Sequence, residues 1–168
     1  FKEEKEKLWP KTWQMACREE DIPESGDHFV YWVIDRSVIV TRTPSGEIKG
    51  FINSCRHRGR CLRDESGSVD KFRCPFHGAT WDLDGQFKGI PNDWDFEHIA
   101  DRDMSLPQVK VATWGGFVFI NFDLDCQPLE DYLDVLPQHF ERFPLEKYFK
   151  AVHVQRVMNC NWKVGAEA

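Results

Sequence analysis

Two short motifs in this sequence each carry one cysteine and one histidine. One residue separates Cys55 from His57, and two residues separate Cys74 from His77. Thiolates and neutral imidazoles are both ligands for transition metals, so these four side chains form a candidate metal-binding set. Sixteen residues lie between the motifs, which is enough for one strand to leave the first motif and another to return to the second. Two loops could therefore meet and hold a metal group between them.

A [2Fe–2S] cluster with mixed ligands is the chemistry that this set fits best. In such a cluster two cysteine thiolates bind one iron and two histidine imidazoles bind the other. Neutral imidazoles leave less negative charge on the cluster, so its reduction potential rises to roughly −150 to +300 mV, against about −400 mV for plant-type clusters. The expected role is the storage and transfer of single electrons, coupled to proton uptake by the imidazoles.

A zinc site with two cysteines and two histidines is the main alternative. Zinc accepts the same atoms, but paired ligands in structural zinc sites are usually about two to four residues apart. Cys55 and His57 are closer than that, and Gly59 and Gly78 suit loops whose backbone N–H groups approach a cluster. We therefore expect an iron–sulfur cluster, and unrelated core cysteines with surface histidines are the least favoured interpretation.

Short β-rich runs flank both motifs and predict a mainly β fold. One run leads into Cys55 and another into Cys74, so both motifs fall on loops between strands. The Asp84-Gly85 pair predicts a type I′ hairpin turn, because such a turn needs residues that tolerate positive φ. The expected fold is therefore a set of small antiparallel sheets with the ligands on two hairpin loops. Strands are predicted over residues 28–34, 38–42, 47–53, 69–73, 79–83, 86–88, 109–113 and 117–122.

Helices are expected mainly towards the two ends of the chain, with one further helical turn near residues 96–100. Residues 1–9 are rich in Glu and Lys and predict a short helix that ends at Pro10, followed by a short strand over 13–16. Leucines recur about one helical turn apart over 129–136 and predict a second helix that ends at Pro137.

The last twenty residues predict a new strand and a new helix. Val152, Val154 and Val157 indicate the strand, and the sequence from Asn161 onwards is typical of a first helical turn. The sequence begins with Phe1 rather than Met and ends on that opening turn, so we expect a fragment of a longer protein.

The composition is that of a globular chain. Hydrophobic residues make up 41% and aromatic residues 14% of the 168 residues, which predicts a packed core. The net charge of −6 argues against nucleic acid as a partner. No apolar run approaches membrane-spanning length, and residues 1–7 lack the apolar centre of a signal peptide, so we expect no membrane partner. A cytoplasmic location is expected because the cysteines are too sparse for a disulfide framework.

The remaining chemistry-bearing residues receive simpler interpretations. Four isolated histidines are expected in structural or surface roles: His28, His98, His139 and His153. Four arginines near the first motif are interpreted as a solvated basic face or, alternatively, as a docking patch for an acidic electron donor: Arg56, Arg58, Arg60 and Arg63.

Both motifs, with their neighbours, resemble the cluster motif of the Rieske non-haem iron oxygenases, the family of ring-hydroxylating oxygenase α-subunits. The resemblance rests first on Cys55-Arg56-His57-Arg58-Gly59 and Cys74-Pro75-Phe76-His77-Gly78. It extends over nearly the whole chain, through residues 13–18, Gly26-Asp27, Asn53-Ser54, residues 81–85, residues 116–121 and Asn161-Trp162-Lys163.

The resemblance implies a terminal oxygenase component built from two domains. A Rieske domain binds the [2Fe–2S] cluster through Cys55, His57, Cys74 and His77 and accepts electrons from a reductase or ferredoxin. An α+β catalytic domain of helix-grip type holds a mononuclear Fe(II) with two histidines and a carboxylate, and activates O₂ to oxidise an aromatic or related small organic substrate. By this resemblance no catalytic residue lies within the chain, because those iron ligands follow Asn161-Trp162-Lys163.

The resemblance also implies a division of the chain and an assembly. Residues 1–27 would form an N-terminal helix and arm, 28–125 the Rieske domain, and 126–168 a linker helix with the first strand of the catalytic domain. His77 would pass the electron to the mononuclear iron of a neighbouring subunit, so a homotrimer, or a trimer with added β subunits, is expected. A stand-alone Rieske ferredoxin is the alternative function, but a carrier has no need of the residues beyond 125.

Overall fold

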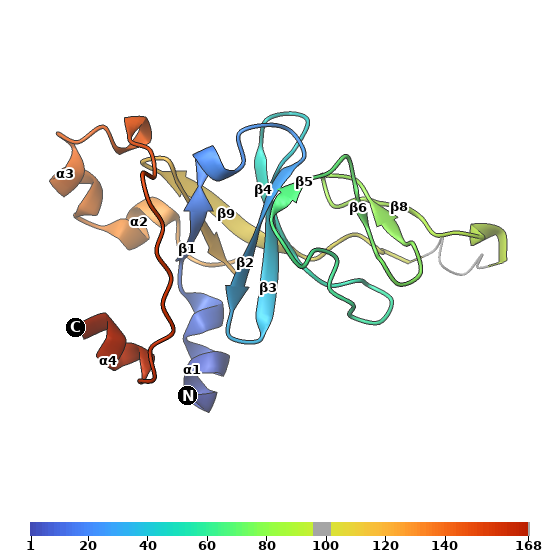
Figure 1. Cartoon of the computed structure of the whole chain (residues 1–168), viewed down its shortest axis with the longest axis horizontal. Helices are drawn as coiled ribbons and strands as arrows, with labels where there is room; N and C mark the ends of the chain where they lie inside the picture. Colours follow the sequence, from blue (N-terminus) through green and yellow to red (C-terminus); the bar gives the residue numbers. More distant parts are fainter. Residues whose placement is uncertain (96–101, 168) are drawn as a thin grey trace.

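The computed structural model describes residues 1–95 and 102–167, and both His98 and the helical turn expected near residues 96–100 lie outside them. Two antiparallel sheets form the body of the molecule (Figure 1). The small sheet lies at the right of Figure 1, and helices α2 (Leu129–Leu133) and α3 (Leu136–Phe140) lie at the left. The mainly β, antiparallel fold expected from the sequence is confirmed.

The main sheet has seven strands in the order β1-β10-β9-β4-β3-β2-β5. Its centre is a meander in which β2 pairs with β3 and β3 pairs with β4. The first strand, which the sequence predicts near 13–16, pairs with the last, so residues 14–18 are an integral part of this sheet. The strands are β1 Gln14–Arg18, β2 Asp27–Val33, β3 Arg36–Arg42, β4 Ile48–Ile52, β5 Gly67–Ser68, β9 Gln108–Trp114 and β10 Phe117–Asn121.

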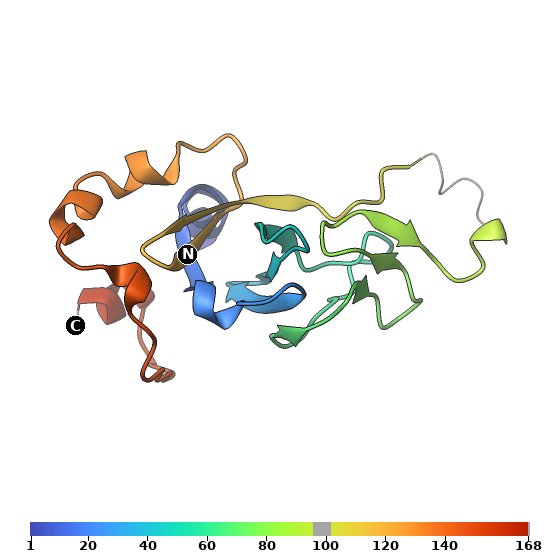
Figure 2. The same ribbon diagram turned by 90° about the horizontal axis from the view of Figure 1, so that it is seen from above.

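The ligand motifs lie in one excursion between two neighbouring strands. β4 pairs with β9, and Ile52 N donates to Pro107 O at 2.8 Å, so the chain leaves the main sheet and returns to it at one place. Between these points it pairs with β2 at the far edge of the main sheet, through β5, and then forms the small sheet of β6 (Phe72–Arg73), β7 (Thr80–Trp81) and β8 (Phe87–Gly89). In Figure 2 the yellow segment that contains β9 runs lengthwise and joins the two parts.

The hairpin after β7 differs from the predicted type I′ turn. Gly85 has a positive φ of 79°, but Asp84 does not, whereas a type I′ turn needs both. Gly85 N donates to Asp82 O at 3.0 Å, and Asp82 N donates to Gln86 O at 3.0 Å. The loop is therefore one residue longer than predicted, with a tight turn that ends on a left-handed glycine.

Among the described residues, three clusters of buried side chains support the fold, and the third packs Trp13 against Leu129 and Leu133 of α2. The cluster beneath the ligand loops contains Cys55 and Cys74 together with the fully buried rings of Phe51, Phe72 and Trp81. In the second cluster, small and aliphatic side chains from β1, β3, β9 and β10 of the main sheet pack together. Because the cysteines of both motifs belong to the first cluster, packing alone brings the two loops to the same place.

The helices follow the predicted positions but not all of the predicted ends. Helix α1 covers Lys2–Lys7, and a short 3₁₀ turn follows at Trp9–Lys11. Pro137 does not end the second helix as predicted. The chain breaks at Asp134, where φ is 50°, and Pro137 stands in the first turn of α3, where its missing N–H costs no hydrogen bond.

The strand predicted from Val152, Val154 and Val157 is wrong. Residues 149–158 have no regular structure, and the three valines are 68–97% exposed. A strand exists only where a neighbour pairs with it, and no described strand lies alongside this segment. The chain instead runs across the edge of the main sheet, where the Arg18 guanidinium donates to the carbonyls of Leu145 and Tyr148.

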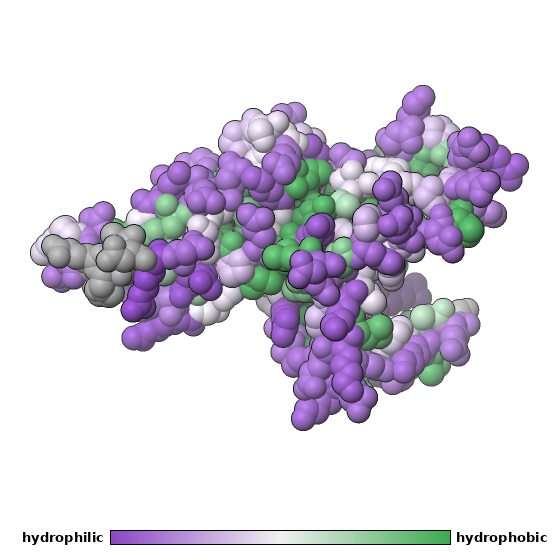
Figure 3. Space-filling model, turned by 180° about the vertical axis from the view of Figure 1, so that it is seen from behind, coloured by the Kyte–Doolittle hydropathy of each residue, from purple (hydrophilic) through white to green (hydrophobic). Residues whose placement is uncertain are grey.

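The final helix, α4 (Trp162–Glu167), lies beside α1 (Figure 1). The indole N–H of Trp162 donates to Glu4, the Lys163 ammonium pairs with the same carboxylate, and Trp162 meets Trp9 edge-on at a centroid distance of 5.1 Å. Figure 3 shows that hydrophilic side chains cover most of one face, with hydrophobic ones gathered near its middle. Within the described ranges, none of the helices is both long and apolar enough to traverse a bilayer.

Candidate metal centre

The two ligand loops have the same backbone construction. Cys55 N donates to Arg60 O at 2.8 Å, and Cys74 N donates to Ala79 O at 2.8 Å, so each loop is closed five residues after its cysteine. Four residues after each cysteine a glycine N–H donates back to the cysteine carbonyl, at 2.9 and 3.0 Å. Both glycines, Gly59 and Gly78, have positive φ (71° and 77°), which explains why glycine stands there.

Each loop surrounds its cysteine sulfur with backbone N–H groups. The N–H groups of His57 and Arg58 face the Cys55 sulfur, and those of Phe76 and His77 face the Cys74 sulfur. Burial raises the pKa of Cys55, and the neighbouring Cys74 thiol raises it further. Burial also acts on Cys74, but the backbone N–H groups and the Cys55 thiol outweigh it and lower its pKa. The backbone N–H groups thus favour a thiolate at both sulfurs, and at Cys74 their effect exceeds that of burial.

The two histidines lie outside the cysteines. Both Cys55 and Cys74 are buried, whereas His57 and His77 are exposed. Their imidazole centroids are 5.0 Å apart, and the His77 ring also contacts the ring of Phe76 at 3.8 Å. The structure therefore brings all four predicted ligands together as an inner pair of sulfurs and an outer pair of imidazoles.

This arrangement of two pairs fits a two-iron cluster. A [2Fe–2S] centre with mixed ligands asks for two sulfurs on one iron and two nitrogens on the other. A single zinc ion would gather all four side chains around one point. Over residues 1–95 and 102–167, there is no group of three or more His, Cys, Asp or Glu side chains placed to hold one metal ion.

Asn53 fixes both ends of the first loop, and the sequence motif did not identify it as a functional residue. Its side-chain amide donates to Ser37 Oγ at 3.1 Å and to Arg63 O at 2.6 Å. Its side-chain oxygen accepts from the N–H groups of Leu62 and Arg63, each at 3.0 Å. This buried side chain thus makes four hydrogen bonds and ties the strand before the loop to the chain after it.

A cavity of about 660 Å³ opens between the two loops. Its lining includes Cys55, His57, His77 and Ala79 from the two ligand loops. Residues 90–92, Arg102 and Met104 also line it. The space gives access to the imidazole side of the candidate centre, where electrons would enter or leave.

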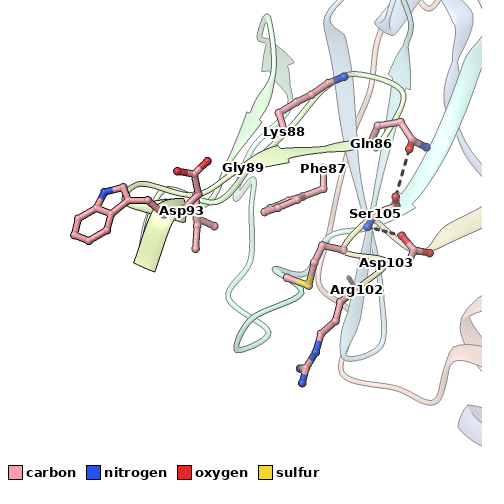
Figure 4. Close-up of a pocket in the computed structure, with 11 residues that line it drawn as sticks. Gln86, Phe87, Lys88, Gly89, Asp93, Arg102, Asp103 and Ser105 are labelled. Carbon is pink, nitrogen blue, oxygen red and sulfur yellow. Dashed lines mark hydrogen bonds between the residues drawn. The ribbon is translucent and has the colours of Figure 1, made fainter. Parts of the chain in front are cut away.

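A second cavity, of about 620 Å³, lies beside β8 and carries no comparable chemistry (Figure 4). Its labelled residues include Lys88, Arg102 and Asp103, and Ser105 N donates to Asp103 Oδ1 at 2.9 Å. Gln86 and Ser105 contact each other across its upper wall. Among the described residues no cysteine or histidine lines it, and it shares Ile90, Arg102 and Met104 with the cavity above the cluster loops.

The four arginines near the first motif do not form one patch. Arg56, Arg58 and Arg60 are exposed, and Arg60 pairs with Asp64 at 3.5 Å. Arg63 turns inwards, and its Nε donates to Nε2 of the buried His28 at 3.1 Å. All six cysteines are free thiols, and Cys17, Cys61, Cys126 and Cys160 are not part of the four-ligand set.

Comparisons with known proteins agree on the family of this chain. The model of the Rieske [2Fe-2S] domain family matches residues 12–105. The biphenyl 2,3-dioxygenase subunit alpha of Rhodococcus jostii is 31% identical over 99% of this chain and 38% of its own length. The glycine betaine monooxygenase oxygenase subunit of Pseudomonas aeruginosa is 31% identical over 99% of this chain and 39% of its own length.

Solved structures give the same result. Naphthalene 1,2-dioxygenase from Rhodococcus sp. superposes with a TM-score of 0.76 and 34% identity over 82% of this chain and 32% of that one. The chain therefore spans somewhat more than a third of the length of the curated relatives it matches.

Proposed function

This chain belongs to the Rieske [2Fe–2S] domain family, and from that membership we propose that it is the electron-accepting portion of a Rieske-type oxygenase α-subunit. Cys55, His57, Cys74 and His77 are the proposed ligands of the cluster. A cluster of this type supplies reversible one-electron storage, and in the oxygenases a mononuclear iron supplies O₂ activation. The oxidation of an aromatic or related small organic substrate would take place on residues outside this chain.

The extent of the match carries this proposal. The Rieske family model ends at residue 105, but the oxygenase subunits match over 98–99% of the chain. The matched region thus includes α2, α3 and the Asn161-Trp162-Lys163 segment. A stand-alone Rieske ferredoxin, the alternative function, would need a cluster domain but none of these later residues.

The chain's own residues perform three tasks in the proposed function. Backbone N–H groups around Cys55 and Cys74 stabilise the negative charge on the sulfurs. Burial of the sulfurs keeps water from the cluster, which would otherwise hydrolyse. The exposed imidazoles of His57 and His77 form the route for the electron and can hold the proton that accompanies reduction. His77, which contacts Phe76, is the proposed exit.

Docking of an acidic electron donor is proposed at Arg56, Arg58 and Arg60. These exposed side chains lie on the first loop. The chain as a whole is acidic, with a net charge of −6. A local positive patch steers an acidic reductase or ferredoxin towards the imidazoles. Arg63 takes no part in this surface, because its Nε is engaged with His28.

The remaining proposals concern assembly, location and substrate. We expect a trimer in which His77 faces the catalytic iron of a neighbouring subunit. The four cysteines outside the ligand set are free thiols, and on that ground we propose a reducing compartment such as the cytoplasm. Relatives named for biphenyl and for glycine betaine are equally similar to this chain, so the test must include both aromatic and quaternary ammonium substrates.

The full-length subunit, purified with its cluster, tests the proposal. We expect the visible absorption and EPR spectrum of a [2Fe–2S] centre with two imidazole ligands, and O₂ uptake with product formation when a reductase and one of these substrates are added. A colourless, zinc-containing protein would overturn the cluster assignment. A protein with the expected cluster that transfers electrons but never consumes O₂ with any substrate would support the ferredoxin alternative.

A further inference from the structure

A buried histidine on β2 links the two ligand loops. His28 is 1% exposed and lies in the main sheet, opposite Thr41 in strand β3. One edge of its ring faces Arg63, which follows the first loop. The ring also meets Phe72 edge-on, at a centroid distance of 5.9 Å and an interplanar angle of 89°. Phe72 lies in β6, two residues before Cys74, so one side chain contacts the supports of both loops.

The hydrogen bonds of His28 define its protonation state. Arg63 Nε is always a donor, so His28 Nε2, at 3.1 Å, must accept and carry no proton. The other ring nitrogen, Nδ1, lies 3.4 Å from Gly26 O and donates to it. The imidazole is therefore neutral in this arrangement, with its proton on Nδ1.

The Arg63 end of this contact is itself rigid. The backbone N–H and the carbonyl of Arg63 both bond to the side chain of Asn53, two residues before Cys55. A displacement of Arg63 therefore moves both the start and the end of the first loop. The path from Asn53 through Arg63 and His28 to Phe72 connects the two halves of the candidate centre.

The charges around His28 disfavour its cationic form. The Arg63 guanidinium faces it directly, and the other groups that approach the ring are the carbonyls of Gly26 and Glu65. Asp27, on the same strand, is the one carboxylate with an attractive effect, and it is weaker than that of Arg63. Burial, and after it Arg63, lower the pKa of His28 from its usual value of 6.5. A proton on Nε2 would also remove the acceptor that Arg63 needs.

We propose that His28 and Arg63 are positioning residues that hold the two ligand loops at the separation a [2Fe–2S] cluster requires, and that protonation of His28 releases both loops together. This inference rests on the proposed cluster function. It predicts that acid weakens cluster retention through a residue that does not itself bind iron. The hydrogen bond from Arg63 to His28 is intact while His28 is neutral, and it is lost as the pH falls and His28 takes up a proton.

The test measures cluster loss rather than enzyme activity. Full-length protein is incubated with an iron chelator, and the decay of the visible [2Fe–2S] absorption is followed between about pH 7.5 and pH 5.5. We expect the wild-type decay to accelerate about tenfold over this range, because a growing fraction of His28 becomes protonated as the pH falls. His28→Gln keeps an acceptor for Arg63 but cannot be protonated there, so its decay should change less than about twofold. The exposed His139 provides the control, and His139→Gln should behave as wild type.

A second variant keeps the test decisive if His28→Gln fails to fold. Arg63→Met removes the contact at every pH, so it should lose its cluster at neutral pH as fast as wild type does in acid, and Arg63→Lys should restore part of the retention. Equal acid acceleration in wild type and His28→Gln, with unchanged spectra, would overturn the proposal. The absence of any [2Fe–2S] spectrum in wild type would instead overturn the proposed function.

Discussion

Gly85 lies directly against the ring of Phe51. A Cβ atom added to Gly85 would stand 2.4 Å from Cε1 of that ring, far inside van der Waals contact. Gly85 belongs to the hairpin that follows the second ligand loop, and Phe51 to the strand that precedes the first. Leu106 N also donates to Gly85 O, at 2.9 Å. The contact therefore packs the hairpin of the small sheet against the main sheet.

Replacement of Gly85 by alanine should destabilise the protein through this contact. Gly46 is the matched control, because it has a similar φ (85° against 79°) but no atom within 4 Å of an added Cβ. Gly46→Ala should lower the free energy of unfolding by about 1 kcal/mol through backbone strain alone. Gly85→Ala should cost about 1–3 kcal/mol more, because the ring must move. Urea unfolding measures both, and equal losses would show that the hairpin can shift away from Phe51.

Asn53→Asp should destabilise the first ligand loop, although it only replaces the side-chain NH₂ group by an oxygen atom. The new carboxylate oxygen would face the Arg63 carbonyl across 2.6 Å, where the amide now donates. We expect a loss of about 2–4 kcal/mol in the free energy of unfolding, together with poor cluster incorporation. Asn161→Asp, at an exposed position, is the control and should be near neutral. Full cluster content and wild-type stability in Asn53→Asp would show that the loop is held by other contacts.

Substitution of either buried cysteine by serine should abolish the cluster. Cys55→Ser and Cys74→Ser should both give protein without the visible absorption of a [2Fe–2S] centre, because serine is a poor ligand at these sites. Cys160 is exposed and distant from the loops, so Cys160→Ser should keep full iron and sulfide content. Iron and acid-labile sulfide analysis provides the measurement. A cluster that survives in Cys55→Ser would mean that the ligand set is wrong.

Charge reversal in the basic patch should slow reduction by the donor. Arg58→Glu is expected to reduce the second-order rate of cluster reduction about tenfold at low salt, and the difference should shrink as ionic strength rises. Arg142→Glu makes the same charge change at an exposed residue next to α3, at the opposite end of the molecule, and serves as the control. Stopped-flow reduction by the cognate reductase or ferredoxin measures the rates. Equal rates for the two variants would place the docking site elsewhere.

The proximity of the two Cys/His motifs was predictable from residue type and spacing, and the structure places their side chains together. Two loops that meet are enough to bring the four side chains together: Cys55, His57, Cys74 and His77. The β-rich runs that flank each motif predicted these loops. The glycines at positions 59 and 78 were also expected to belong to the loops. Each stands four residues after a cysteine in a left-handed backbone conformation, which favours glycine. In the two sheets the strand positions followed from alternation and β-branched content, with ends that differ by a few residues from those expected, whereas the same pattern at residues 152–157 gave no strand.

The supports of the ligand loops were not predictable in the same way. His28 and Arg63 are 35 residues apart, and the pairing of β2 with β5, which places Gly67 opposite His28, returns the chain to His28 after the first loop. Asn53 looks like an ordinary polar residue at the end of a strand, because its four partners become visible only in three dimensions. Pro137 was misread because proline ends a helix from within but is well tolerated in a first turn.

The order of strands in the main sheet sets an order of events during synthesis. β1 pairs with β10, so the first strand waits for roughly 100 further residues, about 5–20 s at usual rates of translation. The meander of β2, β3 and β4 and both ligand loops leave the ribosome within that interval. We expect the iron-binding half of the protein to be accessible to assembly factors before β10 arrives and the sheet is completed.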